Sequence, residues 1–512
     1  MTLKDMPVSK RLEILIRARY PLIYIVSSEE NRVEGTVRKL VTDREKRYFS
    51  WTITKGLLGD DGNSLSDLRE PIKVLDHILE SKVNGVFVLK DFHPFLNDPV
   101  VLRKLRDVSH ELKTSMKNLI FLTPVTKIPQ ELEKEITLLD FDLPQKEEIS
   151  RIIDGILYSL GKKEAEMPEL QGDNKDKIIE ASLGLTAEEA ENVFAKSLVA
   201  AGKFDVQIIL SEKEQIIRKS GVLEYYQTNE QMGQIGGLEN LKEWLQKRSQ
   251  AFTKEARDFG LPQPKGVLMI GIPGCGKSLT AKAISSLWQL PLLRLDVGKV
   301  FSSLVGSSEE NVRMAIKTAE SIAPSILWLD ELEKGFAGMG QGGSTDGGTS
   351  QRVFGTFLTW LQEKTSPVFV VATSNNISAL PPELLRKGRF DEIFYIDLPN
   401  KSEREDIFKI HLDKRKRSST NFNLENLSKL SAGFSGSEIE EVIISSLYDA
   451  FDKKTDIDQH MVEDSIEKII PLSKTMSEEI GKIREWAKQR ARKASLISFE
   501  DEEDKVRQLE MN

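Results

Sequence analysis

The sequence lacks the features of a secreted or membrane-spanning protein. It has one cysteine, Cys275, in 512 residues, so no disulfide can form within the chain and a reducing compartment is expected. No stretch approaches the roughly 18 apolar residues of a membrane span. The charged side chains from Asp5 to Arg19 are unlike a secretory signal. These features predict a soluble, intracellular protein without a membrane span.

An excess of basic charge is also missing. The 72 Lys and Arg residues face 80 Asp and Glu residues, and the formal net charge of −8 gives no overall field that would attract nucleic acid. The composition, 39% hydrophobic and 30% charged, excludes a wholly disordered chain and a disulfide scaffold. At about 150 residues per domain, the length predicts three domains.

Short apolar runs alternate with helical stretches such as residues 311–322. Buried strands that are separated by helices predict an α/β fold, in which helices cover both faces of a parallel sheet. The expected strands are residues 22–26, 85–89, 119–122, 267–270, 326–329 and 368–372.

Three patterns recur in the same order, about 250 residues apart, as expected for two copies of one domain type. Chance similarity of helix starts is the alternative. We favour the repeat, with a break near residues 213–231. The paired segments are 128–132 with 380–384, 141–144 with 396–399, and 184–189 with 433–438.

A phosphate-binding loop is the most specific motif. Residues 271–278 read GIPGCGKS, after an apolar strand and before a helix, and match the pattern G-x-x-x-x-G-K-[ST]. In this pattern the backbone N–H groups turn toward a phosphate chain, Lys277 reaches the β- and γ-phosphates, and Ser278 holds Mg²⁺. ATP and Mg²⁺ are therefore the expected cofactors. The expected binding residues are Pro273, Gly274, Cys275, Gly276, Lys277, Ser278 and Leu279.

Two acids follow the apolar run 326–329 and form a Walker B pattern. Asp330 would hold the magnesium ion, usually through water. Glu331 would act as the general base toward the attacking water. A solvated turn is the alternative for two acids at a strand end, and the phosphate loop upstream favours the Walker B interpretation.

Polar residues beyond the next strand complete the motif set. Asn375 follows the run 368–372, where an amide can orient water against the γ-phosphate, although asparagine also forms ordinary turns. Arg386 and Arg389 lie farther along. They are either surface charges or fingers that stabilise transition-state charge on a neighbouring subunit's nucleotide, and the sequence leaves both readings open.

Together these motifs resemble those of the AAA ATPases, over about residues 230–470. The lead-in Ile235-Gly236 is similar to the segment that contacts adenine in this family. Residues 433–436 resemble the start of a helix in the family's lid. The whole chain is similar to the divergent AAA proteins of cyanobacteria and red-lineage chloroplasts, known as hypothetical chloroplast reading frame forty-six. The strings that carry this similarity are residues 278–283, 352–357 and 381–391.

The resemblance implies a P-loop sheet with a helical lid, and an ATPase that works as a homo-oligomeric ring, usually of six subunits. It makes Asn375 the first sensor and Arg386 and Arg389 the candidate arginine fingers. Such a ring would couple ATP turnover to conformational work on a macromolecular client. The cytoplasm of a cyanobacterium or a chloroplast stroma is the implied location. Leu304 stands where many AAA unfoldases have a pore-loop aromatic residue.

We divide the chain into a first domain at 1–220, a nucleotide domain at 221–400, and a lid with a basic helix and acidic tail at 401–512. The first domain keeps the frame of the repeat and loses its chemistry. Residues 27–32 read SSEENR, without glycine or lysine and with two acids that would repel phosphate. A degenerate AAA-like fold that binds no ATP is predicted, with a role in partner binding or ring assembly.

A basic stretch near the C-terminus supports a second hypothesis. Arg484, Lys488 and Arg492 are spaced by four and would share one helix face near Trp486. Basic residues beside an aromatic side chain can bind RNA or single-stranded DNA. A solvated helix face against an acidic neighbour explains the pattern at least as well. The alternative function is thus a nucleotide-gated protein that binds RNA or single-stranded DNA.

Overall fold

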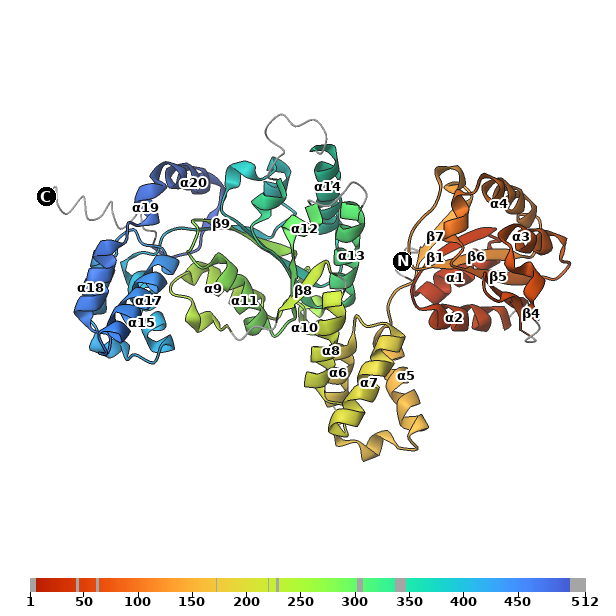
Figure 1. The fold of residues 1–512 in the computed structure, drawn as a ribbon, viewed down its shortest axis with the longest axis horizontal. Helices are drawn as coiled ribbons and strands as arrows, with labels where there is room; N and C mark the ends of the chain where they lie inside the picture. The colour runs from red at the N-terminus through yellow and green to blue at the C-terminus, as the bar shows by residue number, and fades with distance from the viewer. Residues whose placement is uncertain are drawn as a thin grey trace. The chain divides into compact units, whose positions relative to one another are not determined.

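The computed structural model describes residues 6–42, 46–60, 64–171, 173–219, 221–226, 230–301, 307–336 and 347–497. The chain divides into two compact units, Met1–Ile209 and Leu210–Asn512. Each unit contains a seven-stranded, mostly parallel sheet covered by helices (Figure 1). The predicted α/β fold class is confirmed.

The sheet of the first unit has the order β4-β3-β2-β5-β6-β1-β7. Strands β2, β5, β6, β1 and β7 are parallel, and β3 and β4 add an antiparallel edge. The strands are β1 (Leu22–Val26), β2 (Arg47–Thr52), β3 (Gly56–Gly59), β4 (Ser64–Leu65), β5 (Gly85–Lys90), β6 (Asn118–Thr123) and β7 (Ile136–Asp140).

Side chains that alternate along these strands build a core on each face of the sheet. Leu22 and Tyr24 pack into the cluster that holds residues of α3 and α4. Ile23 and Ile25 pack into the opposite cluster, with residues of α1 and α2. The helices are α1 (Val8–Arg17), α2 (Glu30–Thr42), α3 (Pro71–Glu80) and α4 (Pro99–Leu112).

A helical part follows the sheet of the first unit. Helix α5 begins with a capping box of Gln145 and Glu148, and α7 begins with one of Thr186 and Glu189. The boundary between the two units falls within α8. The helices are α5 (Lys146–Ser159), α6 (Asp173–Ser182), α7 (Ala187–Ala201) and α8 (Val206–Lys219).

The sheet of the second unit has the order β14-β13-β9-β12-β11-β10-β8, with β8 antiparallel at one edge. Helices α13 and α14 contribute to the core on one face, and α9 and α11 to the core on the other. The strands are β8 (Leu223–Tyr226), β9 (Gly266–Gly271), β10 (Leu292–Leu295), β11 (Ser325–Leu329), β12 (Val368–Ser374), β13 (Glu392–Ile396) and β14 (Arg492–Lys493). The helices are α9 (Glu239–Arg248), α10 (Lys254–Asp258), α11 (Lys277–Trp288), α12 (Val297–Phe301), α13 (Ser307–Ser321) and α14 (Gly347–Glu363).

The helical lid of the second unit has a hydrophobic core of its own, in which Phe408, Leu427 and Ile443 are fully buried. Its first long helix and its third both begin with capping boxes, Asn400 with Glu403 and Ser435 with Glu438. The helices are α15 (Lys401–Lys414), α16 (Leu424–Leu430), α17 (Gly436–Asp452), α18 (Gln459–Lys468), α19 (Leu472–Thr475) and α20 (Ser477–Arg490).

The parallel strands of the two units follow the same order. They run β7-β1-β6-β5-β2 in the first unit and β13-β9-β12-β11-β10 in the second. The capped starts of α7 and α17 also correspond, as the recurring sequence patterns predicted. The first unit is therefore a second copy of the same domain type.

Some predictions need correction or lie outside the described residues. Helix α20 ends at Arg490, and Arg492 belongs to β14, which pairs with β13. Arg492 therefore does not continue the helix face that was predicted for it. Leu304 and the acidic tail lie outside the described part of the chain. Within the described part, no helix combines the length and apolar character that are needed to cross a membrane.

Candidate nucleotide-binding site

The phosphate loop connects β9 to α11 through residues 272–276. Gly274 and Gly276 have φ angles of +77° and +88°, in the left-handed region that favours glycine. A Cβ atom at Gly274 would also lie 3.0 Å from the hydroxyl oxygens of Ser435 and Ser437 at the start of α17. The loop therefore depends on glycine both for its turn and for its close approach to the lid.

Lys277 is the first residue of α11, and its side chain is buried. Its ammonium group donates hydrogen bonds to the carbonyl oxygens of Gly271 at 2.9 Å and Ile272 at 2.7 Å. Burial lowers the pKa of Lys277 to about 8. A phosphate group would give this desolvated ammonium the negative partner that two neutral carbonyl groups do not supply.

Ser278 and Asp330 come together as the two motifs predict. The Ser278 hydroxyl donates to Asp330 Oδ1 at 3.0 Å, and the Thr373 hydroxyl donates to the same oxygen at 2.6 Å. Hydroxyl and carboxylate oxygens suit a hard cation such as Mg²⁺. Sequence reasoning missed Thr373. Its signal is the strand register, because Ala372 pairs with Leu329 and the next residues then face each other.

Glu331 has a φ angle of +52°, which is unusual for a residue with a side chain. Its N–H donates to the Thr373 hydroxyl at 3.0 Å, so the same threonine contacts both acids. The Glu331 carboxylate forms an ion pair with Lys334, one turn farther along. The hydrogen bond to Glu331 raises the pKa of Lys334. The carboxylate of the candidate base is thus paired with a lysine that the sequence analysis did not select.

Asn375 lies just beyond the end of β12, as predicted, and its N–H donates to Glu333 Oε1 at 3.1 Å. The second carboxylate oxygen of Glu333 is buried without a hydrogen-bond partner. Glu333 was not predicted as a site residue. Its place two residues after Glu331 is the only sequence signal for it.

One cavity of 860 Å³ joins these residues, which is large enough for a nucleotide. Ile235 and Gly236 line it, as do all the predicted residues of the phosphate loop from Pro273 to Leu279. Asp330, Glu331 and Asn375 line it too, so the structure brings the main predicted residues together.

The lid supplies a wall of this cavity that sequence reasoning missed. Ile407, Ile410 and His411 of α15 line it, and their spacing of three and four places them on one helix face. Burial lowers the pKa of His411, whose Nδ1 lies 3.4 Å from Glu440 Oε1. A helix face with two isoleucines and a histidine could contact an aromatic base.

Comparisons with known proteins identify the family of this chain. The AAA family model (ATPase family associated with various cellular activities) matches residues 267–398. Models of SpoVK-like AAA ATPases match residues 8–141 as the N-terminal domain and 147–220 as the second domain. The AAA domain-containing protein ycf46 of Trieres chinensis is 42% identical over 489 residues, which cover 94% of this chain and 97% of the relative. The chain belongs to the ycf46 family of AAA ATPases.

Other AAA proteins match as well. The ycf46 protein of Pyropia yezoensis is 42% identical over 499 residues, which cover 96% of this chain and all of the relative. A Caenorhabditis elegans protein named ATPase family protein 2 homolog is 31% identical over 270 residues, 51% of this chain and 36% of that protein. The resemblance to AAA ATPases is confirmed.

The two candidate fingers of this AAA protein lie apart from its cavity. Arg386 is exposed, and Arg389 is partly buried with its Nη1 lacking a hydrogen-bond partner; neither lines the cavity within the described residues. The loop that carries them is anchored on the start of β9. Lys265 Nζ donates to Gly388 O at 2.7 Å, and Asp391 Oδ2 accepts from the N–H of Lys265 at 2.7 Å.

Cys275 lies in the phosphate loop of this AAA protein and lines its cavity. Burial raises the pKa of Cys275 to about 12. The thiol therefore stays protonated at neutral pH, and a thiol is a weaker nucleophile than a thiolate.

The C-terminal basic residues of this AAA protein are engaged within the second unit. Arg484 donates to Asp397 Oδ1 at 2.9 Å and 3.1 Å, and both side chains are largely buried. Arg492 lies 3.9 Å from a Glu392 oxygen and over the Phe394 ring. The nucleic-acid hypothesis therefore loses two of the residues on which it rested.

Proposed function

We propose that this AAA protein binds ATP with Mg²⁺, hydrolyses it, and works as a homo-oligomeric ring that drives conformational work on a macromolecular client. One observation carries the proposal: the phosphate loop, Asp330, Glu331, Asn375 and a wall of the lid line a single cavity. A binding site for nucleotide alone would not need a carboxylate in the position of Glu331.

The residues divide the reaction between them. Lys277 would turn from the carbonyls of Gly271 and Ile272 to the β- and γ-phosphates. Ser278 and Asp330 would hold Mg²⁺, which neutralises phosphate charge when bound. Glu331 would take a proton from the attacking water while the water oxygen forms a bond to the γ-phosphorus. The bond between the γ-phosphorus and the β–γ bridging oxygen breaks in the same step.

The lid can sense the phosphates through the loop. The N–H of Ser437, in the first turn of α17, donates to Gly274 O at 3.0 Å. Any shift of the loop on binding the γ-phosphate is therefore passed directly to α17. A contact of this kind can bias two arrangements of a lid against its sheet.

The ring proposal rests on the arginine loop. Asn375 would act as the first sensor within the subunit, and Arg386 and Arg389 would act on a neighbouring subunit's nucleotide, because neither lines its own cavity among the described residues. A charged finger at the γ-phosphate stabilises the transition state. A ring of six is the assembly that we propose.

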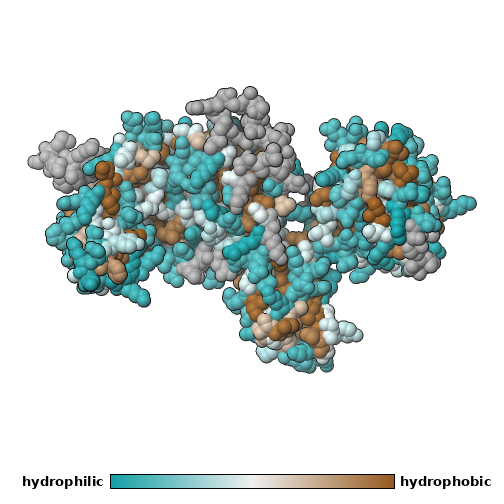
Figure 2. Space-filling model, in the orientation of Figure 1, coloured by the Kyte–Doolittle hydropathy of each residue, from teal (hydrophilic) through white to brown (hydrophobic). Residues whose placement is uncertain are grey.

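The domain roles follow the predicted division into residues 1–220, 221–400 and 401–512. We assign partner binding or ring assembly to the first domain. Figure 2 shows hydrophobic residues on the surface over α5 and α7. Leu160, which follows α5, is 51% exposed, and Val199 of α7 is 90% exposed. The proposed location is a chloroplast stroma or the cytoplasm of a cyanobacterium.

The test compares ATP hydrolysis and particle mass in the wild type and Glu331→Gln. We expect hydrolysis to fall by about 100-fold or more, because general bases contribute about 10²- to 10⁴-fold. ATP should then trap a ring in the variant. The matched control is Asp91→Asn, at the equivalent position after β5, which should leave hydrolysis unchanged. No hydrolysis by the wild type would contradict the proposal, and stimulation by added RNA would favour the nucleic-acid alternative.

A further inference from the structure

The first unit has a different loop at the place that corresponds to the phosphate loop. Residues 27–29 connect β1 to α2, whereas the longer segment 272–276 connects β9 to α11. The shorter connection has no room for the glycine turn that exposes backbone N–H groups to a phosphate chain. Side chains of the chain itself occupy this place instead.

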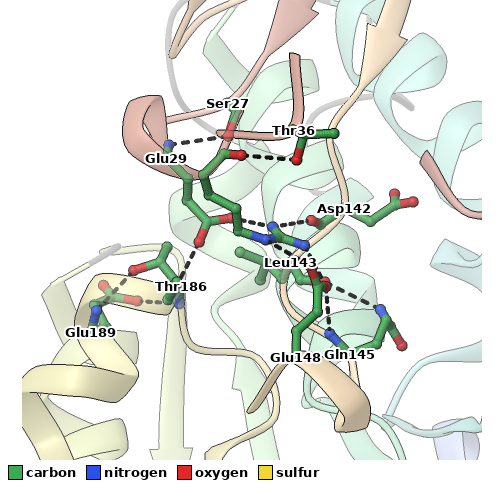
Figure 3. Close-up of polar contacts among 11 residues, drawn as sticks. Ser27, Glu29, Thr36, Asp142, Leu143, Gln145, Glu148, Thr186 and Glu189 are labelled. Atoms are coloured by element: carbon green, nitrogen blue, oxygen red, sulfur yellow. Dashed lines mark hydrogen bonds and ion pairs between the residues drawn. The ribbon is translucent and has the colours of Figure 1, made fainter. Parts of the chain in front are cut away.

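Glu29, at the end of the short connection, has a side chain only 5% exposed. Its Oε1 accepts a hydrogen bond of 2.6 Å from the N–H of Ala187, the first residue of α7. Figure 3 shows Glu29 reaching from its loop toward Thr186, the residue that caps this helix. A carboxylate at a helix N-terminus is favoured by the helix dipole and takes up an N–H group that has no partner within the helix.

Arg32, in the first turn of α2, links the same carboxylate to α5, a second helix of the helical part of the first unit. Its Nη1 donates to Glu29 Oε2 at 2.7 Å and to the carbonyl oxygen of Asp142 at 2.6 Å. Its Nη2 and Nε donate to the two carboxylate oxygens of Glu148, in α5, at 2.7 Å and 3.3 Å. Asp142 and Glu148 lie close together in the same view (Figure 3). Paired, planar contacts of this kind fix an arginine in one orientation.

At the place that corresponds to Asp330, the first unit carries the opposite charge. Lys90 ends β5 and precedes Asp91 at φ +51°, as Asp330 follows β11 and precedes Glu331 at φ +52°. Lys90 Nζ lies 2.8 Å from Glu34 and 3.0 Å from Glu30, both on α2. In the second unit the cation is on the helix and the acid follows the strand, whereas in the first unit the acids are on the helix and the cation ends the strand. These charges neutralise each other without a ligand.

We infer that Glu29 and Arg32 replace the nucleotide as the link between the sheet and the helical part of the first unit. Glu29 stands where a phosphate would meet the phosphate loop and the lid. These contacts form a joint between the sheet and the helical part of the first unit, and the joint keeps one arrangement with or without nucleotide. ATP therefore moves the lid of the second unit only. The first unit acts as a rigid body in every nucleotide state. This inference does not depend on hydrolysis by the second unit.

Hydrogen exchange measured by mass spectrometry on the full chain tests the joint, with and without ATP and Mg²⁺. We expect amides at the start of α7 and in residues 141–148 to be protected equally in both conditions. Arg32→Met, which keeps the length of the side chain and removes its charge, should speed exchange there by at least about tenfold, as expected when a local unit opens more readily. Arg38→Met, on the same helix and outside the joint, should leave these amides unchanged.

The start of α17 serves as the internal reference, because ATP should protect it if the proposed nucleotide site works. Loss of that response alone would contradict the proposed function and leave the joint standing. Protection by ATP at the start of α7 would overturn the inference, as would unchanged exchange in Arg32→Met. Should that variant fail to fold, Glu29→Gln provides the second measurement, and it should speed exchange at Ala187 while leaving β1 protected.

Discussion

The two copies of the domain share a strand order and differ in what holds the sheet to its helices. In the second unit the contact between loop and lid is made at a backbone carbonyl: the N–H and the hydroxyl of Ser437 donate to Gly274 O at 3.0 Å and 3.3 Å. In the first unit it is a network of charged side chains around Glu29 and Arg32. The backbone contact leaves room for a ligand, and the side-chain network fills that room. The same fold can thus host a site or a permanent joint, and only the local residues decide which.

A second pair of positions differs in the same way. Asp142 and Asp397 occupy corresponding places after β7 and β13, and each pairs with an arginine. Asp397 pairs with Arg484 of α20, and these side chains are 10% and 15% exposed. Asp142 pairs with Arg11 of α1, and these are 52% and 21% exposed. We therefore expect the more buried pair, Asp397 with Arg484, to contribute more to the free energy of unfolding than the pair of Asp142 with Arg11.

The largest expected effects concern nucleotide binding, both its affinity and the number of nucleotides bound per chain. Lys277→Ala should lower ATP affinity by about 100-fold, because a hydrogen bond to a charged group contributes about 1.5–3 kcal/mol. Wild-type protein should bind one nucleotide per chain, since the first unit has no phosphate loop. Isothermal titration calorimetry measures both quantities. Two nucleotides per wild-type chain would break the contrast between the copies.

The paired aspartates give the next largest effect. Asp397→Ala should destabilise the second unit by about 3 kcal/mol, because it removes the carboxylate that accepts two hydrogen bonds from the largely buried Arg484. Asp142→Ala keeps its backbone carbonyl and should cost about 0–1 kcal/mol, as exposed ion pairs do. Hydrogen exchange in peptides from β13 and β7 separates the two values. Equal costs would show that exposure does not govern these pairs.

Much of this contrast could be predicted from the sequence. The strand predicted at residues 22–26 coincides with β1, and that at 267–270 lies within β9. Both succeed because a parallel strand buried on two faces is a continuous apolar run. Strand β14 has only Arg492 and Lys493, so no local pattern could show it, and its pairing depends on a partner far away in the sequence.

The sites follow the same division. The phosphate loop and the two acids are local strings, so their positions were predicted, and the structure places them around one cavity. Thr373 and His411 act through strand register and lid packing, which the sequence does not display. The contact between Glu29 and Ala187 joins residues 158 positions apart. The two acids in residues 27–32 predicted that this loop would repel phosphate. Only the structure shows which side chains take the place of the phosphate.

Titration of the two lysines gives a smaller, pH-dependent difference. Burial lowers the pKa of Lys277 to about 8, whereas Lys90, despite its burial, has a raised pKa because of its hydrogen bonds to Glu34 and Glu30. ATP binding needs the charged form of Lys277, so affinity should fall about tenfold between pH 7 and pH 9. Lys277→Arg stays charged and should lose this dependence.

The sign for stability is opposite to that for binding. The folded pKa of Lys277 lies below its ordinary value of 10.5, so the unfolded chain holds more protons at this site between about pH 8 and 10.5. Without nucleotide, this lysine should therefore make the second unit more stable as pH rises through that window, while ATP binds less well. An ATP affinity that is constant from pH 7 to pH 9 would contradict the assignment.

The smallest effect is expected at Lys334, which holds Glu331 in an ion pair. This ion pair has to open before the Glu331 carboxylate can accept a proton from water. Lys334→Ala should therefore raise kcat, and by less than about fivefold, because exposed pairs contribute about 0.2–1 kcal/mol. Lys334→Arg keeps the charge and should match the wild type in steady-state ATP hydrolysis. A fall in kcat for Lys334→Ala would show that the lysine positions Glu331 for the reaction and does not restrain it.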